Sequence, residues 1–460
     1  MARRGTAADT ATTADTAPGP GAATAPGTAT GTATAPVWRR PSVLAAATVL
    51  LVCVPQERDD LTVAADVTLA DAASVALVVV AAATLLRPGR RLPGRVWITA
   101  PPVVAVTAAT VASQDVMASL PGLARYLQVF VLVPLAVVAV LRDRVDLWLV
   151  GGAVCGTALA QGAVGSWQAL TGTGASYAGE NIRAVGTFGA TDVMGMATVV
   201  GYGLVVALAL GLALRGRRRA VALGAAAMLV APLVLSLSRG TWLAVTCAAA
   251  AMLVTYGLRT AVRAGLLAAA ACVLLAGAPA LGLTGDRGPE SGSDTLGHRL
   301  ASIGSSVTEP DRSVSDRYGL WETALGIWRD APVTGAGPRS FPALRDSRAP
   351  LHLSSGSDTA DPVSGFQRQP LLSPHNMYLL VLSEQGLLGA TAFCLFLGCV
   401  TVWCVRRARR TRSPWDRAAG LAASGFLTWQ LVDFVYSDIG GPPTLVTSVM
   451  LGTALWWAAA

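Results

Sequence analysis

The sequence predicts an all-α, polytopic integral membrane protein. Of its 460 residues, 53% are hydrophobic and only 13% are charged, a balance that departs from the usage of soluble domains. The apolar residues fall into twelve separate runs, and arginine is concentrated in every second loop between them. These observations together favour helices that cross a bilayer repeatedly.

Each apolar run is interpreted as a helix, because a bilayer-crossing helix needs roughly 20 mostly apolar residues. The first run is short for this purpose and the tenth is long. The expected spans are about 42–55, 66–86, 96–113, 120–141, 145–169, 193–214, 219–237, 240–257, 262–283, 376–405, 416–436 and 443–459.

The arginines predict the orientation, because cytoplasmic loops of membrane proteins are enriched in positive charge. With the amino terminus inside, the basic residues of the inner loops form five groups along the chain. These are Arg87 to Arg95, Arg142 and Arg144, Arg215 to Arg219, Arg259 and Arg263, and Arg406 to Arg417. The net charge of +8 is therefore a topology signal, and no nucleic-acid partner is expected.

Four regions are expected along the chain. Residues 1–40 form a disordered cytoplasmic tail, because Ala, Thr, Gly and Pro dominate its sequence and leave little to bury. Residues 41–284 form helices one to nine, and residues 285–375 form a large extracytoplasmic loop. Residues 376–460 form helices ten to twelve.

Three arginines break the charge pattern because they lie at the expected outer face: Arg125, Arg183 and Arg239. Arg183 is followed by glycines that let a ligand approach the backbone, but a simple pairing with Glu180 explains it equally well. Arg239 lies in a very short connection, where a guanidinium needs an anionic partner or a route to water. Snorkelling to lipid headgroups is the alternative for Arg239.

Within the outer loop, residues 315–329 are predicted to form an amphipathic helix, with Ser315 as its N-cap and Pro332 beyond its end. Its apolar face consists of Trp321, Ala324, Leu325 and Trp328. We expect this helix to lie over the membrane face and to shape a cavity. A packing role for the two tryptophans explains them as well as ligand contact does.

His375 stands where the polar loop meets span ten, and a histidine there can accept a proton from a hydroxyl nucleophile. The structural alternative is that Asn376 caps the helix and His375 is merely its neighbour. Glu384 lies roughly 13 Å further along that helix. It is either a functional group within the membrane or a partner that caps a neighbouring polar group. The other histidines have no ligand-like spacing with His375, so neither a metal site nor another cofactor is expected.

Four segments carry a recognisable series of motifs. They are Arg183-Ala-Val-Gly-Thr-Phe-Gly189, Ser238-Arg-Gly-Thr-Trp242, the stretch 321–341, and Pro374-His-Asn-Met-Tyr378 followed by Glu384-Gln-Gly386. The series resembles the motifs of the O-antigen ligase and O-antigen polymerase family of bacterial membrane proteins. One departure is Ala190-Thr-Asp192, where that family often has Asn-Pro-Asn.

The resemblance implies a multi-pass glycosyltransferase of the bacterial plasma membrane, with its active site on the extracytoplasmic side. The implied donor is an undecaprenyl-diphosphate-linked glycan, and the acceptor is a hydroxyl of a glycan, a lipid or the cell wall. On this view the reaction is metal-independent and inverting, Arg183 and Arg239 bind the diphosphate, and His375 is the base. The further candidates for substrate binding are Asn376, Tyr378, Trp321, Arg125 and Glu384.

Three other interpretations stay open at this point. Members that join lipid-linked repeat units share the same motifs, so a polymerase is the nearest alternative. A flippase or transporter of lipid-linked glycans would line a pathway with the arginines and would place polar residues at mid-membrane in several spans. A non-catalytic scaffold would leave His375 replaceable.

Overall fold

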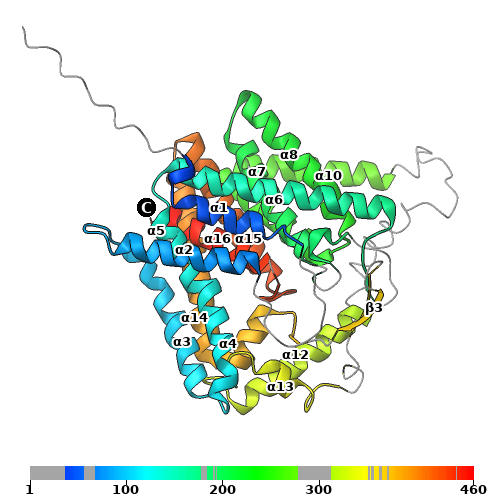
Figure 1. The fold of residues 1–460 in the computed structure, drawn as a ribbon. Helices are drawn as coiled ribbons and strands as arrows, with labels where there is room; N and C mark the ends of the chain where they lie inside the picture. Colours follow the sequence, from blue (N-terminus) through cyan, green and yellow to red (C-terminus); the bar gives the residue numbers. More distant parts are fainter. Residues whose placement is uncertain are drawn as a thin grey trace, which may run out of the picture.

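Helices dominate the computed structural model of this chain (Figure 1). The structure describes residues 37–55, 68–177, 184–189, 192, 194–277, 312–350, 353, 357–361, 365–369, 372–441 and 443–459. The first 36 residues of the predicted tail, Arg183, and residues 285–311 of the predicted outer loop lie outside the described residues.

A helix occupies each of the twelve predicted ranges. They are α1 (Ser42–Leu51), α2 (Leu69–Leu85), α3 (Ala100–Val111), α4 (Val116–Leu127) with α5 (Val133–Val140), α6 (Arg144–Thr171), α7 (Gly195–Ala213), α8 (Gly216–Leu235), α9 (Arg239–Tyr256), α10 (Leu258–Gly277), α14 (Met377–Arg410), α15 (Pro414–Asp433) and α16 (Pro443–Ala459). A π-helix (Gln128–Leu132) joins α4 to α5, and a 3-10 helix (Gly94–Thr99) precedes α3.

Six helical segments within the described residues are long and apolar enough to cross a membrane. They are Gly94–Val111, Val116–Val140, Arg144–Thr171, Gly195–Ala213, Gly216–Leu235 and Met377–Arg410. Helices α1, α2 and α16 are apolar but shorter. The prediction of a helical membrane protein is confirmed, whereas twelve crossings stay a prediction.

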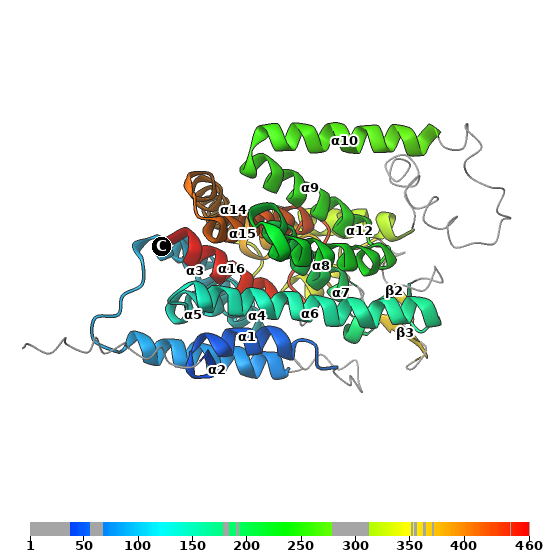
Figure 2. The ribbon, with the colours of Figure 1, turned by 90° about the horizontal axis from the view of Figure 1, so that it is seen from above.

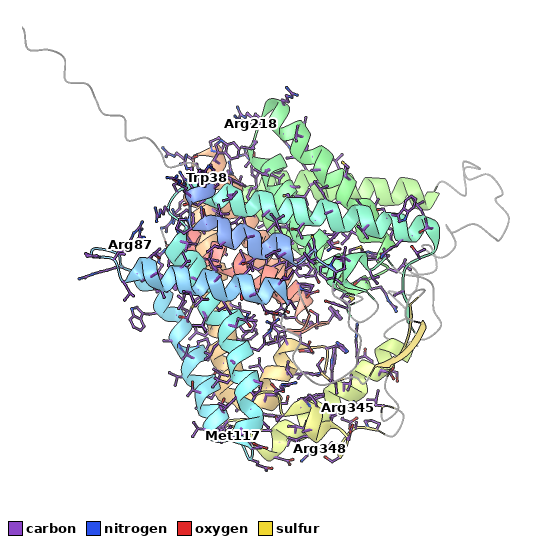
Figure 3. All side chains as sticks on the ribbon, in the orientation of Figure 1. Trp38, Arg87, Met117, Arg218, Arg345 and Arg348 are labelled. Atoms are coloured by element: carbon purple, nitrogen blue, oxygen red, sulfur yellow. The ribbon has the colours of Figure 1, made fainter. Side chains whose placement is uncertain are left out.

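Residues predicted for opposite membrane faces lie on opposite sides of the molecule. On one side, Arg40 forms salt bridges with Asp143, 2.8 Å away at the start of α6, and with the buried Asp146, 3.0 Å away. Figure 3 shows three labelled side chains on this side of the molecule and three on the opposite side: Trp38, Arg87 and Arg218 against Met117, Arg345 and Arg348. The predicted inner-loop and outer-loop residues are thus separated in space.

Helix α7 runs through the interior of the bundle, whose flanks are α10 on one side and α1 with α2 on the other (Figure 2). Tyr202 is fully buried and packs edge-on against Trp429, with ring centroids 4.8 Å apart. Its hydroxyl bonds Thr447, 2.6 Å away, and the side chain of Gln430. This buried network satisfies polar groups that would be costly in a membrane interior.

Helix α14 is broken at Gly386, which has a φ of 62° and a ψ of −164°. The break frees two carbonyls and two N–H groups, and a loop segment pairs with all four. Ala336 and Gly337 donate to the carbonyls of Ser383 and Glu384, 3.0 and 2.9 Å away, and Leu387 and Leu388 donate to the carbonyls of Pro332 and Val333, 2.9 and 3.1 Å away. The loop therefore completes the hydrogen bonding that the helix loses.

In its described residues, the loop between α10 and α14 contains two helices, α12 (Arg312–Asp330) and α13 (Phe341–Arg345). The amphipathic helix is confirmed, but its buried face differs from the predicted one. Leu320, Ala324 and Ile327 form a small core with Phe341 and Leu353, while Trp321 and Trp328 are only partly buried. The helix also begins before Ser315, so the predicted N-cap was wrong.

A small antiparallel sheet departs from the purely helical prediction. Strands β2 (Ser357–Asp361) and β3 (Gly365–Gln369) form a hairpin, and β1 (Ser176–Tyr177) pairs with β2. In this register Ser176 lies opposite Ala360. The sheet brings the chain that follows α6 beside the loop between α10 and α14.

Candidate active site

His375 occupies a strained turn directly before α14. Its φ is 47°, a left-handed conformation that side chains other than glycine rarely adopt. Asn376 follows as the N-cap of α14, because its Oδ1 accepts the N–H of Leu379, 3.0 Å away. On the other side, Trp321 donates its indole N–H to the carbonyl of Pro374, 3.0 Å away. The turn is therefore fixed from both α14 and α12.

Asp438, in the segment between α15 and α16, is the acidic partner of His375. Its carboxylate interacts with the imidazole, with the hydroxyl of Ser373 and with the backbone N–H of His375. Its Oδ2 is buried and has no hydrogen-bond partner among the residues that the structure describes. This oxygen is therefore available to stabilise an imidazolium next to it.

The surroundings shift the pKa of both partners. Burial lowers the pKa of His375 below 6.5, with Asp438 acting in the opposite direction and Arg317 in the same one. Burial raises the pKa of Asp438 above 3.8, while His375, Ser373 and Arg317 oppose that shift. The lowered pKa of His375 favours the neutral imidazole, which is the form that accepts a proton.

Helix α12 brings Arg317 to this pair. Its charge acts on His375, on Asp438 and on the buried Asp433 at the end of α15. Asp433 in turn accepts the hydroxyl of Ser437, and its Oδ1 has no hydrogen-bond partner within the described part of the chain. One guanidinium thus faces two carboxylates and one imidazole.

The segment that carries Asp438 is attached to the start of α14. The N–H of Met377 lies 2.9 Å from the carbonyl of Phe434 and 3.0 Å from that of Ser437. The hydroxyl of Tyr378 donates to the carbonyl of Leu431, 2.7 Å away. These contacts explain why an acid 63 positions after His375 reaches it.

Arg239 begins α9, with Ser238 as the N-cap that accepts the N–H of Thr241, 3.3 Å away. The start of α9 packs against the Asp438 segment, since a Cβ at Gly240 would lie 3.2 Å from the Cβ of Tyr436. Arg239 and His375 therefore flank the same segment, at the same end of the bundle.

Arg183 lies outside the described residues, but the backbone that follows it is held firmly. Two glutamines of α6 clamp it: Gln168 Oε1 accepts the N–H groups of Val185 and Gly186, 3.0 and 2.8 Å away. Gln161 Oε1 accepts the N–H of Thr187, 2.9 Å away. The N–H of Ala184 lies 3.5 Å from the carbonyl of Leu235, four positions before Arg239.

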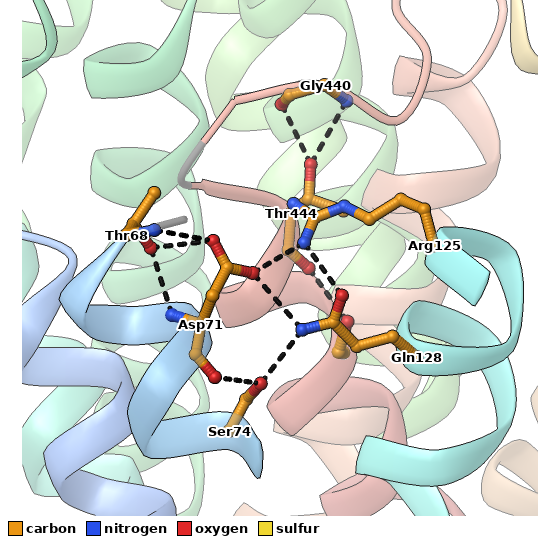
Figure 4. A network of polar contacts seen from close by, with 8 residues as sticks. Thr68, Asp71, Ser74, Arg125, Gln128, Gly440 and Thr444 are labelled. Carbon is orange, nitrogen blue, oxygen red and sulfur yellow. Dashed lines mark hydrogen bonds and ion pairs between the residues drawn. The ribbon is translucent and has the colours of Figure 1, made fainter. Parts of the chain in front are cut away.

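Arg125 belongs to a polar network between helices (Figure 4). Its guanidinium pairs with Asp71 of α2 at 2.6 Å and bonds Gln128 at 2.9 Å. Gln128 also donates to Asp71, 3.1 Å away, and to Ser74, 2.9 Å away. The structure thus gives Arg125 a partner that neutralises its charge and a place in helix packing.

Glu384 is buried, and its carboxylate accepts hydrogen bonds from the loop that packs against the break in α14. Its Oε1 accepts the N–H of Phe341, 3.2 Å away, and the carboxylate also binds the backbone N–H of Arg339. Of the two interpretations left open by the sequence, the contacts show the one in which Glu384 satisfies neighbouring polar groups. Asn376, Tyr378 and Trp321 likewise use their polar atoms in the fold.

The sequence-based candidate set lacked Asp438 and Arg317. A signal for Arg317 was present, because it lies one helical turn before Trp321 on the predicted amphipathic helix. Asp438 follows the apolar run of α15 at the expected outer face, but sequence alone did not indicate which acid of that face meets His375. Across the described residues, no group of three His, Cys, Asp or Glu side chains could hold a metal ion.

Comparison with known proteins adds a decisive observation, because residues 223–394 match the family model described as O-antigen ligase. This part of the chain is similar to the O-antigen ligase family. The matched O-antigen ligase segment runs from α8 into α14 and includes Arg239, Trp321, His375 and Glu384. The family resemblance predicted from the motifs is confirmed, and it indicates a membrane enzyme of the ligase or polymerase type. No match was found among curated proteins.

Proposed function

We propose that this protein is a glycosyltransferase of the bacterial plasma membrane. It transfers a glycan from an undecaprenyl-diphosphate donor to an acceptor hydroxyl, at the outer face. The observation that carries the proposal is His375 in a strained turn beside Asp438, whose segment packs against the start of α9. Strained backbone of this kind clusters at functional sites.

In the proposed reaction, the imidazole of His375 takes the proton of the acceptor hydroxyl. The acceptor oxygen then forms a bond to the anomeric carbon, as the bond from that carbon to the diphosphate oxygen breaks. Undecaprenyl diphosphate leaves with both electrons of that bond, and a single displacement inverts the anomeric configuration. Asp438 stabilises the imidazolium that forms, because an opposite charge nearby favours the charged form.

Arg239 and Arg183 are proposed to bind the diphosphate. Charge builds up on that group as the glycosyl bond breaks, so cations placed there stabilise the transition state more than the ground state. Support for Arg239 comes from its place at the amino-terminal end of α9, which carries a partial positive charge. Support for Arg183 comes from the clamped backbone that follows it.

The test uses the purified full-length chain in lipid nanodiscs with an undecaprenyl-diphosphate-linked oligosaccharide. We expect release of undecaprenyl diphosphate together with an inverted glycosidic bond, at a rate that EDTA does not change. Transfer to a second lipid-linked glycan would favour the polymerase alternative. Movement of the donor across the bilayer without bond cleavage would refute the enzyme and favour the transporter.

Arg239→Lys tests the diphosphate assignment within the same assay. Lysine keeps the charge but loses the planar, bidentate donor geometry, so we expect a higher KM for the donor. Arg217→Lys is the matched control, because Arg217 lies at the start of α8 at the predicted inner face. An unchanged donor KM in Arg239→Lys would refute the assignment.

A further inference from the structure

Arg339 is a strained arginine that the proposed reaction does not use. In the described residues, three side chains other than glycine have a positive φ: Leu237, Arg339 and His375. His375 is the proposed base, and Leu237 directly precedes Ser238 and Arg239. The third strained position therefore stands out, because the other two belong to the proposed site.

The backbone around Arg339 is immobilised by the broken helix α14. Gly335 and Gly337 lie against it so closely that a Cβ at Gly335 would come within 2.3 Å of the Glu384 carbonyl carbon. Ser113, in the turn before α4, also donates to the carbonyl of Ala336, 3.2 Å away. The loop therefore has one conformation that two different helices impose.

Arg339 itself is held on two sides. The buried Glu384 binds its backbone N–H, and α4 approaches so closely that a Cβ at Gly122 would lie 2.9 Å from the Arg339 Cβ. The side chain is nevertheless exposed. The fixed backbone limits the region that this exposed guanidinium can reach, so anion binding costs less backbone freedom here than on a mobile loop.

The place of Arg339 relative to the base suggests which substrate it meets. Asp438 interacts electrostatically with both His375 and Glu384, so the Arg339 loop borders the same cluster. Asn376 and Glu384 are eight positions apart, which corresponds to roughly 12 Å of helix, a length that an oligosaccharide covers. Arg339 lies on the α4 and α14 side of this cluster, whereas Arg239 lies on the α9 side.

We propose that Arg339 binds an oxyanion carried by the acceptor glycan, either a carboxylate or a phosphate. A guanidinium suits both groups because its fork pairs with two oxygens at once. This proposal depends on the proposed function only in taking the bound glycan to be the acceptor. It makes this protein a transferase that selects acidic acceptors over neutral ones.

Binding to purified protein in neutral-lipid nanodiscs tests the proposal. The probes are a tetrasaccharide of galacturonic acid, its carboxyl-reduced neutral form, glucose 6-phosphate and inorganic pyrophosphate. We expect the acidic tetrasaccharide to bind at least about tenfold more tightly than the neutral one. Glucose 6-phosphate binding at Arg339 would identify phosphate as the oxyanion, and its absence would identify carboxylate.

Arg339→Gly is the informative variant because glycine adopts the observed φ without strain. We expect its thermal midpoint to stay or rise while the preference for the acidic tetrasaccharide disappears, and Arg339→Lys to keep part of that preference. Equal binding of the acidic and neutral tetrasaccharides to the wild type together with no binding of glucose 6-phosphate, or an unchanged preference in Arg339→Gly, would overturn the proposal. So would a loss of pyrophosphate binding in Arg339→Gly, because Arg339 would then belong to the diphosphate site.

The two proposals fail in different ways. In one case, Arg339→Gly loses the preference for acidic glycans while a variant without His375 transfers glycan at the full rate. This result would refute His375 as the base and would support the oxyanion site. Normal selectivity in Arg339→Gly, with transfer that requires His375, would refute the oxyanion site alone.

Discussion

Trp321 donates its indole N–H to the carbonyl oxygen of Pro374, 3.0 Å away, and so ties helix α12 to the residue that precedes His375. The same helix carries Arg317, whose charge acts on His375 and on Asp438. Helix α12 therefore sets both the position and the electrostatic environment of the imidazole. The effect of removing this tie can be measured.

Trp321→Phe removes the hydrogen bond and keeps an aromatic ring. One such bond contributes about 0.5–1.5 kcal/mol, so we expect kcat to fall by a factor of about 2–13, with little change in the thermal midpoint. Trp328→Phe is the control, because it loses a similar bond to the Pro332 carbonyl, 3.1 Å away, two helical turns further along α12. Equal kcat losses in the two variants would contradict a positioning role.

Two substitutions should shift the pH dependence of the transfer rate in opposite directions. His375 must be neutral to accept a proton, and burial lowers its pKa, so activity should persist below the pH of about 6.5 at which an unperturbed histidine titrates. Asp438 raises that pKa and Arg317 lowers it. Asp438→Asn should therefore move the acid limb of the kcat profile to lower pH, and Arg317→Gln should move it to higher pH. Shifts in the same direction would exclude this cluster as the source of the profile.

Because α14 is broken at Gly386, replacing two of its glycines with alanine should change stability in opposite directions. A Cβ at Gly386 would lie 2.3 Å from the carbonyl oxygen of Val333, and its φ is 62°. Gly386→Ala should lower the free energy of unfolding by roughly 2–4 kcal/mol. Gly398 has no neighbouring atom within 4 Å of an added Cβ, so Gly398→Ala should raise it by about 0.5–1 kcal/mol. Thermal midpoints in one detergent provide the comparison, and similar values would rule out the described break.

The Arg125 network predicts an effect on stability with little effect on donor affinity. The side chain of Arg125 is 32% exposed and that of Asp71 is 15% exposed, so breaking the pair should cost about 1–2 kcal/mol, less than a fully buried pair. A double-mutant cycle with Arg125→Ala and Asp71→Ala should give a coupling energy of about 0.5–2 kcal/mol. If Arg125→Ala instead raised the donor KM without lowering stability, Arg125 would bind substrate.

The sequence predicted the helices well because apolar runs and arginine placement act locally. All twelve ranges contain helix, and the O-antigen ligase family followed from short motifs. The β1 strand was missed because two residues, Ser176 and Tyr177, pair with a hairpin nearly 200 positions away. The break at Gly386 was missed because it depends on a loop that docks from outside the helix.

In the candidate site, too, residues with a local sequence signal were predicted, and residues that depend on distant contacts were not. His375 and Arg239 were found because each interrupts a local pattern. Asp438 and Arg317 were not selected, because their role depends on three separate segments that meet in space: α12, the start of α14, and the segment between α15 and α16. Asn376 was selected as a substrate contact, although its side chain caps α14, a function that sequence analysis had considered.

The rate of glycan transfer by His375→Ala tests the central claim most directly. The assay uses purified protein in nanodiscs with an undecaprenyl-diphosphate-linked oligosaccharide, and His298→Ala is the control, a histidine that belongs to none of the four motifs. Because general base catalysis contributes typically 10²–10⁴-fold, we expect at least a hundredfold loss of kcat in His375→Ala, a normal thermal midpoint and unchanged donor binding. Transfer at the wild-type rate would show that His375 is not the base.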